Sequence, residues 1–344
     1  MVKINFVGDI ALFRQFQRMK VDPFKELELP ESDFNIGNFE FVIPNNRQKN
    51  FFDVADEYKT DYSYFSNLNL NKFQAFGLAN NHIMDYGEEG IHDVMKVFKN
   101  KNIKTFGVGQ KPFNILRITL NDISFSVIAC VKPGRWIQEK NIGPDLYDRD
   151  AIIQEIQKEK KNTDHVIIFT HVGTELVNIP DPKDVKNARD FISVGASAVI
   201  GHHPHIIQGI EEYNKGIIAY SLGSFIYLPE FEMGYSNNQK EERNFSICLQ
   251  LTFNKNTVEK SDIHYYKLNP ETLLPSPYVE KNEHFNNLNK WIDEPSRYYK
   301  QIRTQLLKRE IKSFFQRFNE NPFKTLRHYF SYLKFKHIKT ILNR

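Results

Sequence analysis

Residues 198–211 read AVIGHHPHIIQGIE, an apolar run that gives way to three histidines within four positions. The whole chain has eleven histidines in 344 residues, so this stretch concentrates them. If the strand continues through the run, alternate side chains share a face, and His203 and His205 would point toward one site across Pro204. Neutral imidazole is a common ligand of divalent metals. An isolated pair of this kind is more often an ordinary surface or core feature, so the interpretation needs support elsewhere in the chain.

Four other short apolar runs end in residues of the same chemical kind. Those residues are Asp9, Glu40, Asn81 with His82, and His171. Between the runs lie stretches with apolar residues three and four apart, such as 87–101 and 149–162, which predict helices. Alternating strands and helices indicate α/β layers, in which functional side chains gather at strand ends. Five strand ends that carry carboxylate, amide or imidazole groups therefore predict a metal site.

Turn signals indicate that the sheets are mixed. The stretch 117–131 is interrupted by Asn121-Asp122, and a second pair of apolar runs is separated near Asn214-Lys215-Gly216. Both patterns predict hairpins, and 244–268 is a third antiparallel candidate. Prolines at 270, 275 and 277 suggest a linker, so we expect a functional domain at 1–270 and a linker with a basic helical extension at 271–344.

Composition excludes several classes of protein. Hydrophobic residues make up 40% of the chain, which is typical of a globular protein. The two cysteines, Cys130 and Cys248, lie inside apolar runs and read as buried structural thiols, which excludes a disulfide framework. We find no signal peptide and no apolar run of about 18 residues that could cross a membrane. The expected location is the cytoplasm or the inner face of the cell membrane.

The positive charge is concentrated at the C-terminal end. Residues 300–344 contain twelve Lys or Arg and two acids, Glu310 and Glu320, although the net charge of the whole chain is only +4. One interpretation is a helical lid whose apolar stripe packs on the body. The other is an interfacial helix pair that docks on an anionic membrane surface. The acidic body and the lack of a reader motif argue against a nucleic-acid partner.

Six segments of the chain resemble a known family. GDIAL, GNFE, ANNHIMDYGEEGI, THVGTE, GHHPHIIQGIE and YSLGSF occur, within residues 2–230, in the order found in the bacterial capsule-synthesis protein CapA family. That family is involved in poly-γ-glutamate or polysaccharide capsule production. The resemblance implies a fold similar to the calcineurin-like metallophosphoesterases, a four-layer α/β/β/α sandwich with a two-metal site. It also implies that the partners are a surface-polymer precursor and other capsule-synthesis proteins.

The resemblance assigns roles to individual residues. Two divalent ions, drawn from Mn, Zn, Fe or Mg, would be held by Asp9, Glu40, Asn81, His171, His203 and His205. Glu40 lies where a bridging carboxylate is expected, and His82 resembles a substrate-facing general acid. Asp85 could orient His82, or it could cap the helix that follows.

The chain departs from the phosphoesterase pattern at its first motif. Those enzymes have D-x-H, whereas Asp9 is followed by Ile10 and Ala11, so one ligand is missing. Glu40 also replaces an aspartate. Two functions stay open. One is a metal-dependent hydrolase or transferase acting on a phosphorylated or amide-linked surface-polymer precursor. The other is a non-catalytic capsule-assembly or polymer-binding component with a structural or ligand-binding metal site.

Five further residues are candidates for substrate binding. Glu175 and Glu211 each follow a ligand histidine and could bind a basic substrate group, support the ligands or be solvated carboxylates. Arg135, next to Pro133-Gly134, could contact an anionic or sugar-like substrate or pack within its loop. The remaining candidates are Asn38, two residues before Glu40, and His202, directly before His203.

Overall fold

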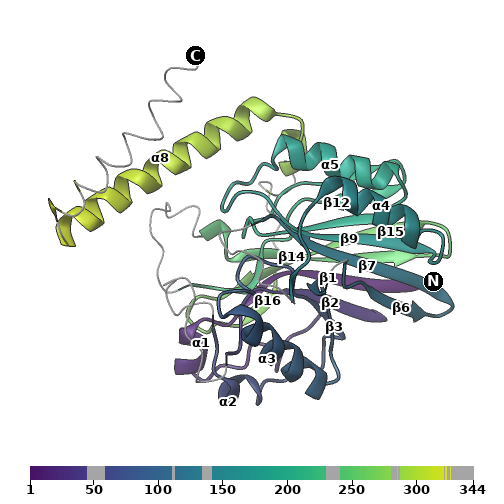
Figure 1. The fold of residues 1–344 in the computed structure, drawn as a ribbon, viewed down its shortest axis with the longest axis horizontal. Helices are drawn as coiled ribbons and strands as arrows, with labels where there is room; N and C mark the ends of the chain where they lie inside the picture. The colour runs from purple at the N-terminus through teal and green to yellow at the C-terminus, as the bar shows by residue number, and fades with distance from the viewer. Residues whose placement is uncertain are drawn as a thin grey trace.

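The computed structural model describes residues 1–44, 59–110, 113–133, 142–229, 241–279, 285, 287–320, 322–323 and 326. Two mixed sheets pack face to face, and helices cover the outer side of each (Figure 1). Phenylalanine rings from opposite sheets meet between them: Phe106 lies 5.5 Å from Phe169, and Phe125 lies 5.1 Å from Phe253. The predicted α/β/β/α sandwich is confirmed.

The first sheet is built around the N-terminal strand β1. Its order is β16 (Pro275–Pro277), β15 (Val258–Leu268), β14 (Phe245–Phe253), β1 (Val2–Ala11), β2 (Phe34–Phe39), β3 (Ala75–Gly77) and β4 (Lys104–Phe106). Strand β1 changes its partner along its length: it pairs with β14 from Val2 to Val7 and with β13 (Ser224–Tyr227) from Asp9 onward. Strands β1 to β4 and β13 run parallel, whereas β14 to β16 run antiparallel to their neighbours.

The second sheet contains two of the predicted hairpins. Its order is β11 (Ile210–Tyr213), β12 (Gly216–Ala219), β10 (Ala198–His202), β9 (His165–His171), β7 (Ile123–Val131) and β6 (Leu116–Leu120). Asn121 and Asp122 both have positive φ, as do Asn214 and Lys215, which is the backbone of a two-residue hairpin turn. The antiparallel pairs β6–β7, β11–β12 and β14–β15 are confirmed. A short separate pair joins β5 (Val108–Gly109) to β8 (Gly143–Pro144).

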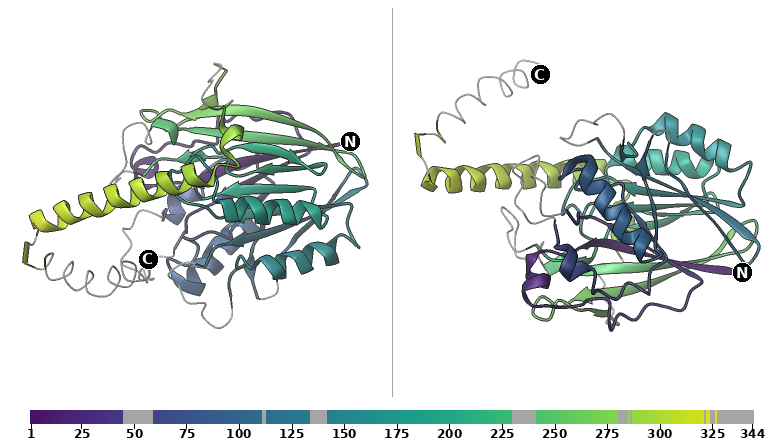
Figure 2. Two further views of the ribbon diagram at one scale, coloured as in Figure 1. Left: turned by 90° about the horizontal axis from the view of Figure 1, so that it is seen from above. Right: turned by 60° about the horizontal axis from the view of Figure 1, so that its bottom comes forward.

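The outer helices are held by apolar faces. Helix α3 (Gly87–Asn100) covers the first sheet, where Phe98 packs against Phe39 and Phe76 with ring centroids 4.7 and 5.0 Å away. Helices α4 (Arg149–Glu159) and α5 (Pro182–Ser193) cover the second sheet, where Phe191 is fully buried. Asp148 and Asp181 cap these two helices with side-chain hydrogen bonds. Short helices α1 (Arg14–Arg18) and α2 (Tyr62–Phe65) lie on the α3 side (Figure 2). Cys130 and Cys248 are buried, and burial raises the pKa of both thiols.

The chain beyond residue 270 continues into the body. Strand β16 adds an edge to the first sheet, and the turn η1 (Leu288–Trp291) leads into the long helix α8 (Pro295–Glu320). The domain division at residue 270 stays a prediction. Within the described ranges, no helix combines the length and apolar character that crossing a membrane requires.

Gly8 has no room for a side chain, because strands β1 and β13 meet closely there. A Cβ atom on Gly8 would lie 2.1 Å from the carbonyl oxygen of Gly223, which accepts a hydrogen bond from the Asp9 N–H. We expect Gly8→Ala to lower the free energy of unfolding by about 3 kcal/mol, the upper end of overpacking costs. A Cβ on Gly37 would lie 2.9 Å from the Phe76 ring and 3.2 Å from Ile10 Cδ1, which are side-chain atoms that can shift more easily than backbone, so Gly37→Ala should cost less. Urea unfolding of the two variants gives the comparison, and equal midpoints would contradict it.

Candidate metal centre

The predicted ligands meet where the two sheets face each other. Asp9 lies in the last part of β1, and Glu40 directly follows β2. On the second sheet, His171 is the last residue of β9, and His203 follows the end of β10. Because the carboxyl ends of parallel strands share one edge, these side chains converge although they are far apart in the sequence.

Two groups of potential ligand atoms share one carboxylate. The His171 group consists of Glu40, His171 and His203, and the Asp9 group consists of Asp9, Glu40 and His205. Within each group, one ligand atom per residue lies within 4.8 Å of the others. Glu40 belongs to both groups. This is the geometry in which a single carboxylate can lie between two cations.

The contacts in the His171 group have the spacing of ligand atoms around one ion. His171 Nε2 lies 3.4 Å from Glu40 Oε1, 3.2 Å from His203 Nδ1 and 2.8 Å from Asn81 Oδ1. Metal–ligand bonds of about 2.0–2.2 Å place neighbouring ligands about 3–3.5 Å apart. The Asn81 oxygen therefore fits as a further ligand of this group.

The Asp9 group has similar spacing. His205 Nδ1 lies 3.0 Å from Asp9 Oδ2, and His205 Nε2 lies 3.5 Å from Glu40 Oε1. Despite the short distance, His205 Nδ1 has no partner with hydrogen-bond geometry among the described residues. The nitrogen and the carboxylate are thus close without being bonded to each other, as two ligands of one ion would be.

Glu40 provides the test of whether a cation fits. Its side chain is fully buried, and neither carboxyl oxygen has a hydrogen-bond partner among the described residues. Burial, followed by the charge of Asp9, raises the pKa of Glu40 well above its ordinary value. A buried carboxylate with no partner is strongly destabilising, and a coordinated cation is a normal way to compensate it. The oxygen and nitrogen donors around Glu40 therefore fit a divalent metal site.

The histidines of the His171 group are neutral at physiological pH. Burial lowers the pKa of His171 well below its ordinary value and that of His203 to about 4, and neighbouring histidines add to both shifts. Burial alone would raise the pKa of Asp9, but the His205 and Asn38 side chains hold it below its ordinary value. The site thus presents imidazole lone pairs beside an ionised carboxylate, which is what metal binding requires.

The backbone around His203 corrects the strand-based prediction. Strand β10 ends at His202, and His203 and His205 both have left-handed backbone, with φ of 96° and 59°. Their rings are 5.9 Å apart, and each joins a different ligand group. The expectation that alternation along a strand aims them at one point is therefore wrong. Such backbone costs about 1–3 kcal/mol per residue and is concentrated at functional sites.

His82 and Asp85 form a pair beside the ligands. His82 Nδ1 lies 2.8 Å from Asp85 Oδ2, and His82 Nε2 lies 3.2 Å from the Asn81 amide nitrogen. Asn81 thus stands between His82 and His171. Helix α3 begins at Gly87 with Tyr86 as its N-cap and no side-chain cap, so Asp85 does not cap the helix and its carboxylate contacts His82 instead.

Asn38 and His202 lie behind the ligands. Asn38 donates a hydrogen bond to Asp9 Oδ1 over 2.7 Å and approaches His171 Nδ1 at 3.2 Å. His202 packs on Phe169 with ring centroids 4.2 Å apart, and its Nε2 lies 3.2 Å from the Val7 carbonyl oxygen. Both are buried, so their contacts indicate a supporting role in place of the predicted contact with substrate.

Glu175 and Glu211, two other substrate candidates, have different surroundings in the structure. Glu175 is half-buried in the loop after β9, and its charge adds to the raised pKa of Glu40. Glu211 accepts two hydrogen bonds from Arg189, over 2.9 and 2.8 Å, and one from the Tyr220 hydroxyl over 2.6 Å. These contacts tie Glu211 to helix α5 and not to the metal candidates. Arg135 lies outside the described residues.

Two residues that lie near the ligands were not identified from the sequence. The Tyr227 ring stacks on His205 with centroids 4.0 Å apart, and Tyr227 pairs in register with Ala11, the position of the missing D-x-H ligand. Asn80 Oδ1 accepts the backbone N–H groups of His82 and Ile83 and so fixes the loop that carries Asn81. The only signal for Asn80 is its place in the ANNH motif.

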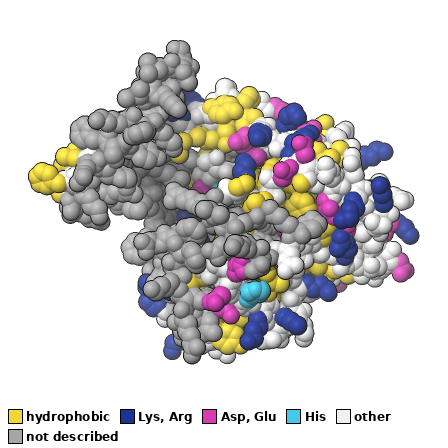
Figure 3. All heavy atoms as spheres, viewed as in Figure 1, with side chains coloured by type: hydrophobic (Ala, Val, Ile, Leu, Met, Phe, Trp, Pro, Cys, Tyr) yellow, Lys and Arg dark blue, Asp and Glu magenta, His cyan; other side chains and the backbone are white. Residues whose placement is uncertain are grey.

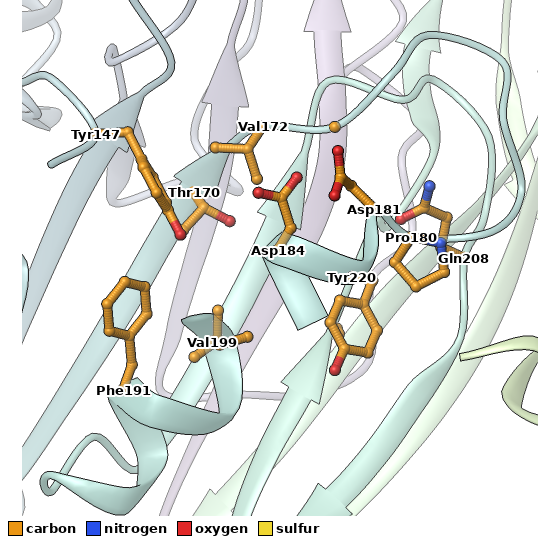
Figure 4. Close-up of a pocket in the computed structure, with 13 residues that line it drawn as sticks. Tyr147, Thr170, Val172, Pro180, Asp181, Asp184, Phe191, Val199, Gln208 and Tyr220 are labelled. Carbon is orange, nitrogen blue, oxygen red and sulfur yellow. The ribbon is translucent and has the colours of Figure 1, made fainter. Parts of the chain in front are cut away.

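A cavity on the helix-covered side of β9 is not the site. Figure 4 shows side chains around it, among them Thr170 from β9, Asp184 from α5 and Tyr220, which directly follows β12. Its volume of about 20 Å³ has room for a single water and not for a substrate. Asp184 is paired there with Lys132 at 2.7 Å.

The chain is similar in sequence to known bacterial proteins. A family model described as bacterial capsule synthesis protein PGA_cap matches residues 3–228. The capsule biosynthesis protein CapA of Bacillus anthracis is 26% identical over 313 residues, which cover 83% of this chain and 72% of that protein. The PGA biosynthesis protein CapA of Bacillus subtilis is 28% identical over 291 residues, covering 79% and 73%.

A crystal structure of a hypothetical protein from Thermus thermophilus aligns with 77% of this chain and 99% of that one, at 12% identity and a TM-score of 0.45. The fold is assigned from the sheet topology described above and not from this alignment. The family model matches most of the chain and spans all six of the motifs that suggested the resemblance. The chain therefore belongs to the bacterial capsule synthesis protein PGA_cap family.

Proposed function

We propose that the chain is a metal-dependent hydrolase or transferase of capsule or exopolymer biosynthesis. Its substrate is a phosphorylated or amide-linked precursor of a surface polymer, and its centre takes two divalent ions. The observation that carries the proposal is the position of Glu40, a buried carboxylate without a hydrogen-bond partner, in both ligand groups. Family membership supports the assignment to capsule biosynthesis.

The ligand set favours ions that accept both nitrogen and oxygen, which include Mn, Zn, Fe and Mg. Ions bound there would supply Lewis acidity toward a phosphoryl or carbonyl oxygen and lower the pKa of water. His171 and His203 offer lone pairs without first losing a proton, whereas Glu40, with its raised pKa, must lose one. Metal affinity should therefore rise with pH, with protons released on binding.

His82 is the residue we assign to proton transfer. Its Nδ1 faces the Asp85 carboxylate, while Nε2 faces Asn81 and the ligands. The His82 side chain is 13% exposed, so a substrate can reach it from solvent. In this role His82 donates a proton to the leaving group, and Asp85 holds the ring in position.

A non-catalytic assembly or polymer-binding role is the second candidate. The observation that favours it is Ala11, a fully buried methyl group at the position of the absent D-x-H ligand. Turnover of a generic aryl phosphodiester, measured together with metal content, separates the two functions. A fully metal-loaded protein that turns over neither phosphoesters nor γ-glutamyl or glycan substrates would establish the assembly role.

Single histidine variants should remove one ion each. His203 belongs only to the His171 group and His205 only to the Asp9 group, so we expect His203→Ala and His205→Ala each to lose about half of the bound metal. Elemental analysis after equilibration with Mn²⁺ measures the stoichiometry. His92→Ala, an exposed histidine on α3, is the matched control and should bind like the wild type. Unchanged stoichiometry in both ligand variants would refute the assignment.

A further inference from the structure

Helix α8 is attached to the body through its N-terminal part, from Tyr298 to Gln305. Tyr298 is buried with Val177 and Ile179, and Ile302 packs on the same cluster. The Tyr298 hydroxyl contacts Asp181 Oδ2 at 2.9 Å and Thr174 Oγ1 at 3.1 Å. Beyond this attachment the helix extends away from the sheets (Figures 1 and 2).

The remainder of α8 carries a second apolar row. Leu307, Ile311 and Phe315 follow one another at intervals of four residues and are 56%, 49% and 59% exposed. At about 100° per residue, Leu307 lies on the opposite side of the helix from Tyr298, and Ile311 lies opposite Ile302. The row is therefore not a continuation of the face that packs on the body. Figure 3 shows hydrophobic side chains at the end of α8 farthest from the sheets.

The charge of the helix indicates what kind of surface this row fits. The α8 sequence contains seven Lys or Arg and two acids, and Lys300, Arg303 and Lys308 are exposed. An apolar row among basic residues is typical of helices that lie in the interface of anionic membranes. A second copy of this helix would instead bring two positively charged surfaces together, which is unfavourable. Charge complementarity thus favours lipid.

We propose that the outer part of α8 docks on an anionic membrane surface, with Leu307, Ile311 and Phe315 inserted at the level of the headgroups. The attached end of α8 rests on the loop that follows His171, through Thr174 and through Leu176, whose carbonyl oxygen accepts a hydrogen bond from Gln305. The proposal does not depend on whether the centre is catalytic.

Vesicle flotation of the full chain tests the proposal. We expect the wild type to float with phosphatidylglycerol–phosphatidylcholine vesicles at low salt and not with pure phosphatidylcholine. Binding should fall about tenfold or more when salt rises to 0.5 M, because screening weakens attraction between exposed charges. The triple variant Leu307→Ser, Ile311→Ser and Phe315→Ser should lose binding. Tyr62→Ser removes a similarly exposed apolar side chain from the body and should bind normally.

Two results would overturn the proposal. One is the absence of flotation of the wild type at low salt, and the other is undiminished flotation of a triple variant whose unfolding midpoint matches the wild type. Sedimentation analysis identifies the alternative occupant. A wild-type dimer that the triple variant abolishes, without vesicle binding by either protein, would assign the row to a second copy of the chain.

Discussion

Replacing Glu40 with glutamine should abolish metal binding in both ligand groups at once. Glu40 is the one residue that the two groups share, and an amide offers a weaker, uncharged oxygen at that position. We therefore expect Glu40→Gln to lose both ions, whereas His203→Ala and His205→Ala lose one each. Elemental analysis of the three variants side by side measures the difference.

The same substitution should stabilise the metal-free protein. The raised pKa of Glu40 means that the folded protein holds this proton more tightly than the unfolded chain does. Stability of the wild type therefore falls as pH rises above the ordinary value of 4.5 and levels off above the raised value. Glutamine has no such loss, so the advantage of Glu40→Gln in free energy of unfolding should be small at pH 5 and larger at pH 8.

Urea unfolding in the presence of a chelator, at both pH values, tests this expectation. Glu212→Gln changes an exposed carboxylate on β11, in the same sheet as β10, and should alter neither metal content nor the pH dependence. A Glu40→Gln protein that retains one ion would contradict the sharing of Glu40. An advantage that shrinks as pH rises would contradict the sign of its pKa shift.

The strand ends of this site were predictable from sequence, because each is a local transition from an apolar run to a polar residue. Glu40 and His171 lie where such transitions placed them, whereas β1 continues two residues past Asp9 to Ala11 and pairs there with β13. The division of the ligands between two groups was not predictable. It depends on the left-handed backbone at His203 and His205. The surrounding fold imposes this conformation, and the residue types at these positions do not predict it.

Proximity in sequence to a ligand was a poor guide to proximity in space. Glu211 follows His205 by six residues, yet β11 carries it to Arg189 on the outer helix. Asn38 precedes Glu40 by two residues, and its side chain turns inward to Asp9. In the same way, the spacing of apolar residues in α8 predicted a stripe, but only the packing of Tyr298 showed which face meets the body. Direction is set by tertiary contacts, which local patterns do not encode.

Replacing His82 with alanine should lower turnover about 10²–10⁴-fold, the usual contribution of a general acid, while metal content stays at the wild-type level. His82 contacts Asn81 and Asp85 but belongs to neither ligand group, so its removal opens no coordination position. Asp85→Asn keeps a partner for His82 Nδ1 and so keeps the ring in place, and we therefore expect a smaller loss of turnover. His92→Ala is again the matched control.

Turnover and metal analysis on the same preparations distinguish the roles of His82. Parallel loss of metal and activity would make His82 a ligand. Unchanged turnover would remove His82 from the chemistry and leave proton transfer to another group near Asn81.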